Sequence, residues 1–258
     1  MRLKDKKIIV TGGARGIAKA VTMAYVAEGA KVAVFDILDE LGKETVTEAN
    51  QKGPGEAFYF NCDISKKSAV DTAFTEAVAA LGGLDVLANI AGVDRNTPTM
   101  EITNEEYDFI MDINVRGTML TNQAAYITMA EQGYGNIINF GSDTGLVGAP
   151  GQAIYGASKA AVMSWTRTIA NEWGRIGIRS NSVIPAIATP MFEEYKAKMN
   201  DEELAMFNES MKHTIPLGGQ LGDPDKDLAP VMVFLASDDT RFMNGQIISV
   251  NGGLGSVR

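Results

Sequence analysis

A tyrosine and a lysine stand four residues apart in a stretch whose spacing of apolar residues is that of a helix. Tyr155 and Lys159 would therefore project from one face of that helix. A phenol has a pKa near 10, so acting as a base at neutral pH requires roughly 3–4 kcal/mol of phenolate stabilisation, part of which an adjacent ammonium supplies. Ser142, 13 residues before Tyr155, would hold a carbonyl oxygen beside the phenol. A Tyr-x-x-x-Lys pair by itself arises often by chance, and an ordinary surface tyrosine is the alternative.

A glycine-rich turn follows the first apolar run of the chain. The turn reads TGGARGIA from Thr11 and contains Gly12, Arg15, Gly16 and Ile17. Such a turn lets a pyrophosphate reach backbone N–H groups and the positive end of the following helix. A plain connection between a strand and a helix is the alternative.

An acidic residue ends the second apolar run. Asp36 lies 20 residues after Gly16, where a carboxylate accepts hydrogen bonds from a ribose diol and repels a 2′-phosphate. The spacing predicts NAD rather than NADP, although an N-cap for the next helix is the alternative role. Arg15 is the counter-evidence, since a cation in this turn can bind a 2′-phosphate, but burying a phosphate against Asp36 is costly.

Short apolar runs alternate with longer amphipathic stretches, which predicts the elements that position these residues. We expect strands over 7–11, 31–36, 56–61, 84–89, 135–140, 178–184 and 246–250. We expect helices over 16–28, 39–52, 65–81, 103–115, 117–132, 152–174, 190–212 and 225–236, with Ser65 as an N-cap. Uniformly apolar strands between helices predict an α/β doubly wound Rossmann fold, with a seven-stranded parallel sheet and helices on both faces. In this fold ligands bind at the carboxyl ends of the strands, where all of these motifs fall.

Composition narrows the class of protein further. The 258 residues suit a single domain over 1–258, and the net charge of −9 argues against a nucleic-acid partner. Cys62 is the only cysteine, which excludes an internal disulfide and fits a reducing compartment. No signal core and no apolar run of roughly 20 residues is present, so we expect a cytoplasmic protein away from membranes. His213 is the only histidine, which leaves neither a Ser-His-Asp hydrolase nor a His-rich metal site, and no metal is expected.

Together these motifs resemble the short-chain dehydrogenase/reductase family, in its single-domain branch, over essentially the whole chain. The matching segments are the TGGARGIA turn, Asp36, Cys62-Asp63-Ile64, Asn89-Ile90-Ala91-Gly92, Asn114 in MDINVRG, Ser142, YGASK from Tyr155, Asn181 to Thr189, and NGQIISVNGG from Asn244. The resemblance implies that Tyr155 is the acid and base and that Ser142 orients the substrate oxygen. It implies that Lys159 lowers the pKa of the tyrosine and binds the nicotinamide ribose, and that Asn114 holds a water linking Lys159 to solvent.

The resemblance also implies contacts to the cofactor. Asp63 would bond the adenine amino group with Ile64 beside it, and Asn89, Ala91 and Gly92 would line the adenosine side. Pro185, Ile187 and Thr189 would fix the nicotinamide. A polar residue in a kinked helix is the alternative for Asn114, and a buried hydrogen bond at a strand end is the alternative for Asn89; either can hold together with the functional role.

Three departures from the family pattern stand out. Ala18 replaces the last glycine of the turn, an accepted change in dinucleotide sites. Ala186 replaces the usual Pro-Gly, and the segment Pro185 to Thr189 is one residue shorter than the common pattern. Ile90 replaces an asparagine, which we interpret as a packing change. The short Pro185 segment and GDPDKD near the C-terminus resemble a few bacterial hydroxysteroid dehydrogenases.

The sequence therefore predicts an oxidoreductase that transfers a hydride between NAD(H) and a secondary alcohol or ketone, a hydrophobic one such as a hydroxysteroid. Alternatives are a sugar-nucleotide epimerase, for which the chain is short, and a non-catalytic NAD-binding regulator on the same fold. A helical lid around 187–215 would cover the substrate, or this segment packs in a core or subunit interface. The resemblance implies a homotetramer, built by pairing the helices near 103–132 and 152–174 across subunits. Small residues on helix 152–174 would permit this close approach, with Trp165 and Trp173 packing into a partner, unless this face packs only on its own sheet.

Overall fold

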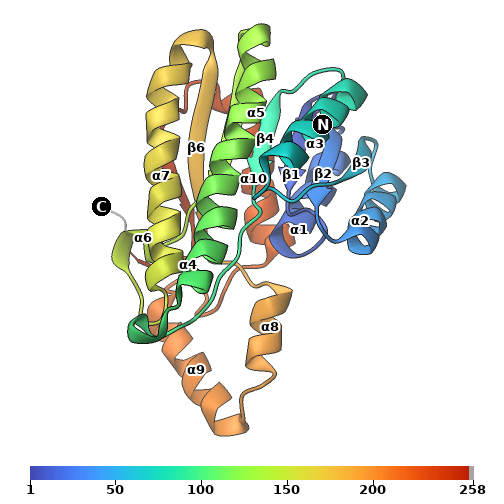
Figure 1. Cartoon of the computed structure of the whole chain (residues 1–258). Coiled ribbons are helices and arrows are strands. Elements are labelled where there is room, and N and C mark those ends of the chain that lie inside the picture. Colours follow the sequence, from blue (N-terminus) through green and yellow to red (C-terminus); the bar gives the residue numbers. More distant parts are fainter. Residues whose placement is uncertain (256–258) are drawn as a thin grey trace.

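Seven strands form one parallel sheet in the order β3-β2-β1-β4-β5-β6-β7 (Figure 1). The computed structural model describes residues 1–255, apart from the side chains of Met191 and Tyr195. The strands are β1 (Lys7–Thr11), β2 (Lys31–Asp36), β3 (Glu56–Asn61), β4 (Val86–Asn89), β5 (Gly135–Phe140), β6 (Ile178–Pro185) and β7 (Ile247–Val250). The chain leaves β1 toward one edge of the sheet and returns at β4 to build the other, so the switch in strand order lies between these two strands. The predicted doubly wound fold is confirmed.

Helices cover both faces of the sheet, which is why its strands are apolar on both sides. One apolar layer is made with α1 (Gly16–Ala27), α2 (Asp39–Lys52) and α10 (Ala229–Ala236). The other is made with α3 (Lys67–Leu81), α5 (Gly117–Gln132) and α7 (Ala153–Trp173). Within residues 1–255, every helix falls short of the length and apolar character that a membrane span requires.

The remaining helices gather near the carboxyl ends of the strands. Apart from η3 (Gly174–Ile176) and η5 (Asp238–Thr240), which are 3-10 turns at the amino ends, they are α4 (Asn104–Met111), the π-helix η2 (Asp112–Arg116), α6 (Thr144–Val147), α8 (Pro190–Lys196), α9 (Asp201–Thr214) and the π-helix η4 (Pro224–Leu228), with the 3-10 turn η1 (Thr99–Glu101). Helices α8 and α9 extend beyond this edge of the sheet (Figure 1). The single helical region expected over 190–212 is thus two helices, and a capping box at Asn200 starts the second.

Two local expectations were wrong. Ser65 does not cap α3, which begins at Lys67 after an N-cap residue with no side-chain bond. The Ser65 hydroxyl and N–H instead donate to Asp63 Oδ1 at 2.6 and 3.0 Å, because a carboxylate two residues away is a strong local acceptor. Strand β4 begins at Val86 rather than Leu84. Just before it, the Asp85 carboxylate accepts the Lys7 N–H, and regular pairing with β1 starts only at the next residue.

A buried chain of polar side chains ties the central strands together at their carboxyl ends. The Thr11 hydroxyl donates to Asn89 Oδ1 at 3.0 Å, and Asn89 Nδ2 donates to Asn139 Oδ1 at 3.2 Å. Asn139 Nδ2 in turn donates to Asn122 Oδ1 on α5 at 2.9 Å. Buried amides left without partners would each cost about 1–3 kcal/mol, so this chain fixes the register of β1, β4 and β5 against α5.

Candidate active site

The glycine-rich turn after β1 lies against the loop after β4. Gly12 has φ of +73°, and a Cβ added there would lie 2.9 Å from the Ala91 Cα. Only glycine combines this left-handed backbone with so close an approach. The Gly13 position is equally tight against Val34, which makes it a packing glycine that sequence reasoning did not single out.

Helix α1 begins at this turn with its N-terminal N–H groups free of side-chain caps. Arg15 is the N-cap residue, its side chain is exposed, and no acidic residue occupies the first turn. The positive end of the helix is therefore left to interact with an anion. At Gly16, where φ is +59°, an added Cβ would meet only the Pro190 ring at 3.7 Å, so the start of α8 faces the turn. The predicted pyrophosphate residues fit a dinucleotide.

Asp36 ends β2 with its carboxylate aimed back at the turn. Its Oδ2 accepts the Ala14 N–H and its Oδ1 accepts the Leu38 N–H, both at 3.0 Å. Each oxygen retains a lone pair for a ribose hydroxyl. The N-cap of α2 is Leu38, so Asp36 does not have the alternative capping role.

A second carboxylate, which sequence analysis did not identify, stands beside Asp36. The Tyr59 hydroxyl lies 2.8 Å from both the Asp36 carbonyl and Asp39 Oδ1. Hydrogen bonds from Asn61 and Tyr59 lower the pKa of Asp39, which keeps it charged. The end of β2 and the start of α2 therefore carry two neighbouring carboxylates.

The residues expected on the adenosine side divide into two kinds. Asp63 is half-buried and pairs with Lys66 at 3.1 Å, while Ile64 packs beneath Gly117. The Ala91 N–H bonds to the Thr11 hydroxyl, which fixes the loop backbone. Asn89 is 2 % exposed, and its amide hydrogen-bonds to Thr11 and Asn139 within the buried polar chain. The alternative role of Asn89, a buried hydrogen bond at a strand end, therefore agrees with the structure.

Three predicted catalytic side chains meet at the start of α7. The Ser142 hydroxyl hydrogen-bonds to the Tyr155 phenol and lies 2.9 Å from the Thr144 hydroxyl. Lys159 is buried, with Nζ 5.7 Å from the centre of the Tyr155 ring. Helical spacing brings Tyr155 and Lys159 together, and β5 delivers Ser142 opposite them.

The electrostatics of this group differ from expectation. Burial, reinforced by the charge of Asp94, raises the pKa of Tyr155 to about 12, against the smaller opposite effect of the Ser142 hydrogen bond. Burial lowers the pKa of Lys159 to about 8. The expected lowering of the tyrosine pKa by Lys159 is therefore wrong for the chain alone, because the ammonium donates to the Phe140 carbonyl at 3.0 Å instead of to the phenol.

Asn114 lies in the π-helix η2 and holds the loop after β4. Its amide accepts the Val93 N–H and donates to the Val93 carbonyl, each at 2.8 Å, and also donates to the Ser158 hydroxyl at 3.0 Å. A Cβ added at Gly92 would lie 3.1 Å from Asn114 Oδ1 and 3.2 Å from Lys159 Nζ, so this loop runs between the two side chains. The kinked-helix interpretation of Asn114 agrees with this structure, and its water-holding role stays a prediction.

The short segment after β6 pairs with the chain before η4. Ala188 N–H donates to the Gly222 carbonyl at 2.9 Å, and Gly222 N–H donates to Ala186 at 3.0 Å. Pro185 ends β6, and the Ile187 side chain is buried in the core, which leaves only its backbone for a ligand. The Thr189 hydroxyl accepts the Phe192 N–H at 3.2 Å at the start of α8.

Two polar side chains near the phenol were missed by sequence analysis. Asp94 hydrogen-bonds to Gln152, and its charge acts on both Tyr155 and Lys159. Asp94 stands only two residues after Gly92, and this position after a strand was the available signal.

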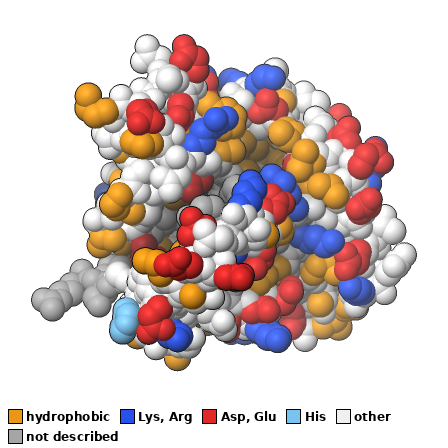
Figure 2. All heavy atoms as spheres, turned by 90° about the horizontal axis from the view of Figure 1, so that it is seen from below, with side chains coloured by type: hydrophobic (Ala, Val, Ile, Leu, Met, Phe, Trp, Pro, Cys, Tyr) orange, Lys and Arg blue, Asp and Glu red, His pale blue; other side chains and the backbone are white. Residues whose placement is uncertain are grey.

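Figure 2 looks onto this end of the molecule and shows acidic and basic side chains interspersed with apolar ones.

Comparisons with known proteins agree on one family. Residues 12–255 match the family model described as Enoyl-(Acyl carrier protein) reductase. The chain is 35% identical to the 3-oxoacyl-[acyl-carrier-protein] reductase FabG of Thermotoga maritima, over 98% of this chain and 99% of that protein. It is 38% identical to the 2,5-dichloro-2,5-cyclohexadiene-1,4-diol dehydrogenase of Sphingobium indicum, over 99% of both chains. The structure of levodione reductase superimposes with a TM-score of 0.92 at 30% identity, over 100% of both chains.

The close approach at Gly12 leads to a test of the dinucleotide turn. Gly12→Ala should weaken NADH binding at least tenfold, because the methyl must displace the Ala91 backbone. Gly133→Ala is the matched control, since Gly133 has nearly the same φ of +74° but no atom within 4 Å of an added Cβ. Fluorescence titration with NADH and urea unfolding would be run on both variants. Equal NADH affinities in the two variants would contradict the assigned contact.

Proposed function

We propose that this chain oxidises a secondary alcohol or reduces a ketone with NAD(H). The premise is that the chain belongs to the short-chain dehydrogenase/reductase family. The family establishes an oxidoreductase that acts on alcohol and ketone groups with a nicotinamide dinucleotide. The single observation that carries the assignment is the meeting of Ser142, Tyr155 and Lys159 at the sheet edge that also holds the glycine turn.

In the proposed reaction the carbinol C–H bond breaks with its electron pair, and the O–H proton passes to the Tyr155 phenolate. The nicotinamide supplies the two-electron acceptor for oxidation, or the donor for reduction. Ser142 orients the reacting oxygen by its hydroxyl. A pKa of about 12 keeps the phenol of the chain alone protonated at neutral pH, which is the form that donates a proton in ketone reduction.

Lys159 and Asn114 would serve the proton path. Because the pKa of Lys159 is lowered to about 8, its side chain can switch between ammonium and amine close to neutral pH. Asn114 holds the loop that runs beside the ammonium, so it would act on the path by positioning. The cofactor would rest on Gly12, Arg15, Gly16 and Ile17, on Asp63, Ile64, Ala91 and Gly92, and on the backbone of Pro185 and Ile187 with the Thr189 hydroxyl.

Charge at the ribose end supports NAD over NADP. Asp36 and Asp39 both lie beside the position of the adenosine ribose, so a 2′-phosphate would meet two carboxylates. Arg15 has an exposed side chain and would have to offset both charges to favour NADP. One cation against two anions, of which Asp36 is partly buried, leaves NAD the better ligand.

Helices α8 and α9 support the interpretation of this segment as a lid. Pro190 contacts Gly16 across the cofactor turn, and the Phe192 and Phe207 rings lie 5.8 Å apart between the two helices. An apolar contact at this place would suit a hydrophobic ring substrate, a hydroxysteroid among them. A non-catalytic regulator is the weaker alternative, because Ser142, Tyr155 and Lys159 are all retained. A cytoplasmic location stays a prediction from cysteine usage.

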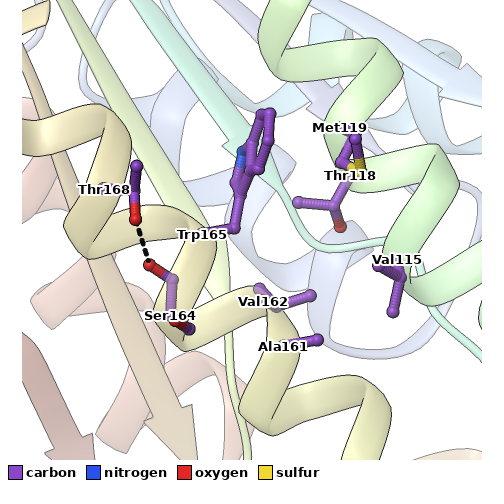
Figure 3. Close-up of a pocket in the computed structure, with 8 residues that line it drawn as sticks. All are labelled: Val115, Thr118, Met119, Ala161, Val162, Ser164, Trp165 and Thr168. Carbon is purple, nitrogen blue, oxygen red and sulfur yellow. Dashed lines mark hydrogen bonds between the residues drawn. The ribbon is translucent and has the colours of Figure 1, made fainter. Parts of the chain in front are cut away.

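A groove between α5 and α7 supports assembly into a homotetramer (Figure 3). It has a volume of about 360 Å³ and is lined by Val115, Thr118, Met119, Ala161, Val162, Ser164, Trp165 and Thr168. The small residues Ala157 and Ser164 of α7 are exposed and permit close helix approach. The tryptophans, however, contact α5 of their own chain: Trp165 Nε1 donates to Asn122 at 3.1 Å, and Trp173 stacks on Tyr126.

Removing the phenol hydroxyl tests the proposed chemistry. Tyr155→Phe keeps the ring but removes the dissociable proton, so kcat should fall by several orders of magnitude with NAD binding nearly intact. Tyr107→Phe, on the exposed face of α4, is the control and should retain wild-type turnover. Stopped-flow or steady-state NADH absorbance gives the measurement, and near-wild-type kcat in Tyr155→Phe would refute the assignment.

Replacing Asp36 tests the choice of cofactor. Asp36→Ala should narrow or invert a wild-type preference for NAD over NADP in kcat/KM, because the repulsion is removed and Arg15 remains. Asp36→Asn removes the charge but keeps one oxygen that can accept a loop N–H. Comparing it with Asp36→Ala separates the effect of the charge on cofactor choice from the effect of a loosened loop. A wild-type enzyme that prefers NADP would overturn this role of Asp36.

Light scattering tests the assembly. At micromolar concentration the mass should be about four times the 27.6 kDa of one chain. Ala161→Glu, which places a charge in the groove, should lower the mass, whereas Asn171→Glu on the exposed part of the same helix should not. A wild-type mass near 27.6 kDa would exclude the tetramer.

A further inference from the structure

The loop after β4 is held rigidly over the start of α7. At one end, the Asn114 amide bonds both the N–H and the carbonyl of Val93 at 2.8 Å. At the other end, Thr97 N–H donates to the Gly151 carbonyl at 2.9 Å, and Gly151 leaves no room for a Cβ beside Asn96. The backbone between these two anchors is therefore held in place near the phenol.

Asp94 lies between these anchors, and its carboxylate reaches into the open end of the site. It hydrogen-bonds to the Gln152 amide, is solvent-exposed, and forms none of the ion pairs found among residues 1–255. The neighbouring Arg95 guanidinium lies 4.9 Å from the Phe109 ring centre instead. Lys159 is within electrostatic reach, but its ammonium donates to the Phe140 carbonyl. The Arg95 backbone N–H also donates to this carboxylate, whose two oxygens together still have lone pairs for a ligand.

A carboxylate beside a proton-transferring phenol has a cost. The negative charge of Asp94 acts with burial to raise the pKa of Tyr155, which opposes formation of the phenolate needed for alcohol oxidation. A hydrogen bond donated to Asp94 by a bound molecule would partly neutralise the carboxylate. The raising effect of Asp94 on the Tyr155 pKa would then be smaller. A substrate that brings such a donor would therefore favour the phenolate that alcohol oxidation needs.

We propose that Asp94 and Gln152 bind a second hydroxyl of the substrate, so that the enzyme acts on diols and hydroxyketones in preference to simple alcohols and ketones. This inference rests on the proposed function. Gln152 lies one helical turn before Tyr155, so the second hydroxyl would be only a few bonds from the reacting carbon. The carboxylate accepts from the hydroxyl, and the amide can donate to the same oxygen.

Other polar groups fit this pair less well. An ammonium on the substrate would enter a site that already holds the Lys159 cation. A carboxylate or phosphate on the substrate would be repelled by Asp94, in a chain whose net charge is −9. A neutral donor is the remaining class, and hydroxyl is the common one on a substrate of this enzyme type.

Matched pairs of alcohols test the proposal. With NAD and wild-type protein, kcat/KM would be compared for cyclohexanol, the 1,2- and 1,4-cyclohexanediols, 2-butanol, 2,3-butanediol and trans-2-aminocyclohexanol. A hydrogen bond to a charged group predicts a diol preference of roughly 10- to 100-fold over the matched monoalcohol. Asp94→Asn should reduce this ratio and Asp94→Leu should abolish it, with the KM for NAD unchanged. Glu101→Gln, an exposed acid on the same connection, should keep the wild-type ratio.

The outcomes separate the two proposals. A ratio that is the same in wild type, Asp94→Asn and Asp94→Leu overturns the role of Asp94, as does a wild-type preference for the amino alcohol or for the monoalcohols. If Asp94→Leu fails to fold, Asp94→Asn and Gln152→Leu supply the ratio. Wild-type protein that binds NADH yet oxidises no alcohol of any kind overturns the proposed function itself, and this inference with it.

Discussion

One hydroxyl group at the switch in strand order determines the geometry on which the site depends. Thr11 Oγ1 donates to Asn89 Oδ1 and accepts the N–H groups of Ile90 and Ala91, each at 3.0 Å. It therefore joins the end of β1, which leads to the glycine turn, to the end of β4, which leads to the loop beside the phenol. The Gly12 approach to Ala91 is possible because these two strand ends are locked together. The positions of the glycine turn and of the loop after β4 are therefore both fixed by the hydrogen bonds of one hydroxyl group.

The second constraint is electrostatic, because an acidic chain must bind an anionic cofactor. Backbone N–H groups at the start of α1 provide the favourable field, with no acidic side chain in the first turn. Acidic residues lie away from this helix end, with Asp36 and Asp39 near the end of β2 and Asp94 near the phenol. Lys159 is a buried cation near Tyr155, and burial lowers its pKa to about 8.

Periodicity predicted the sheet well because strands buried on both faces are uniformly apolar and helices keep their spacing. Local spacing also placed Tyr155 and Lys159 close together on one helix and Asp36 at a strand end, as the structure has them. The failures are non-local. Ser65 bonds Asp63 instead of capping a helix, and the amide of Asn89 is spent on partners from three other elements. The phenol pKa depends on burial and on Asp94, which is 61 residues distant in sequence, and no pattern along the chain contains that contact.

These differences follow a physical division within the fold. Side chains below the sheet edge, such as Asn89 and Asn139, are fully buried, so each must satisfy its partners and any change is costly. Side chains on the connections above the edge, such as Asp94 and Gln152, are partly or fully exposed, and these two hydrogen-bond to each other on a loop held through its backbone. Changing them alters what the site binds at little cost to folding. The polar groups below the edge are therefore committed to the fold, whereas those on the connections above it remain available to a ligand, and only the folded chain defines their positions.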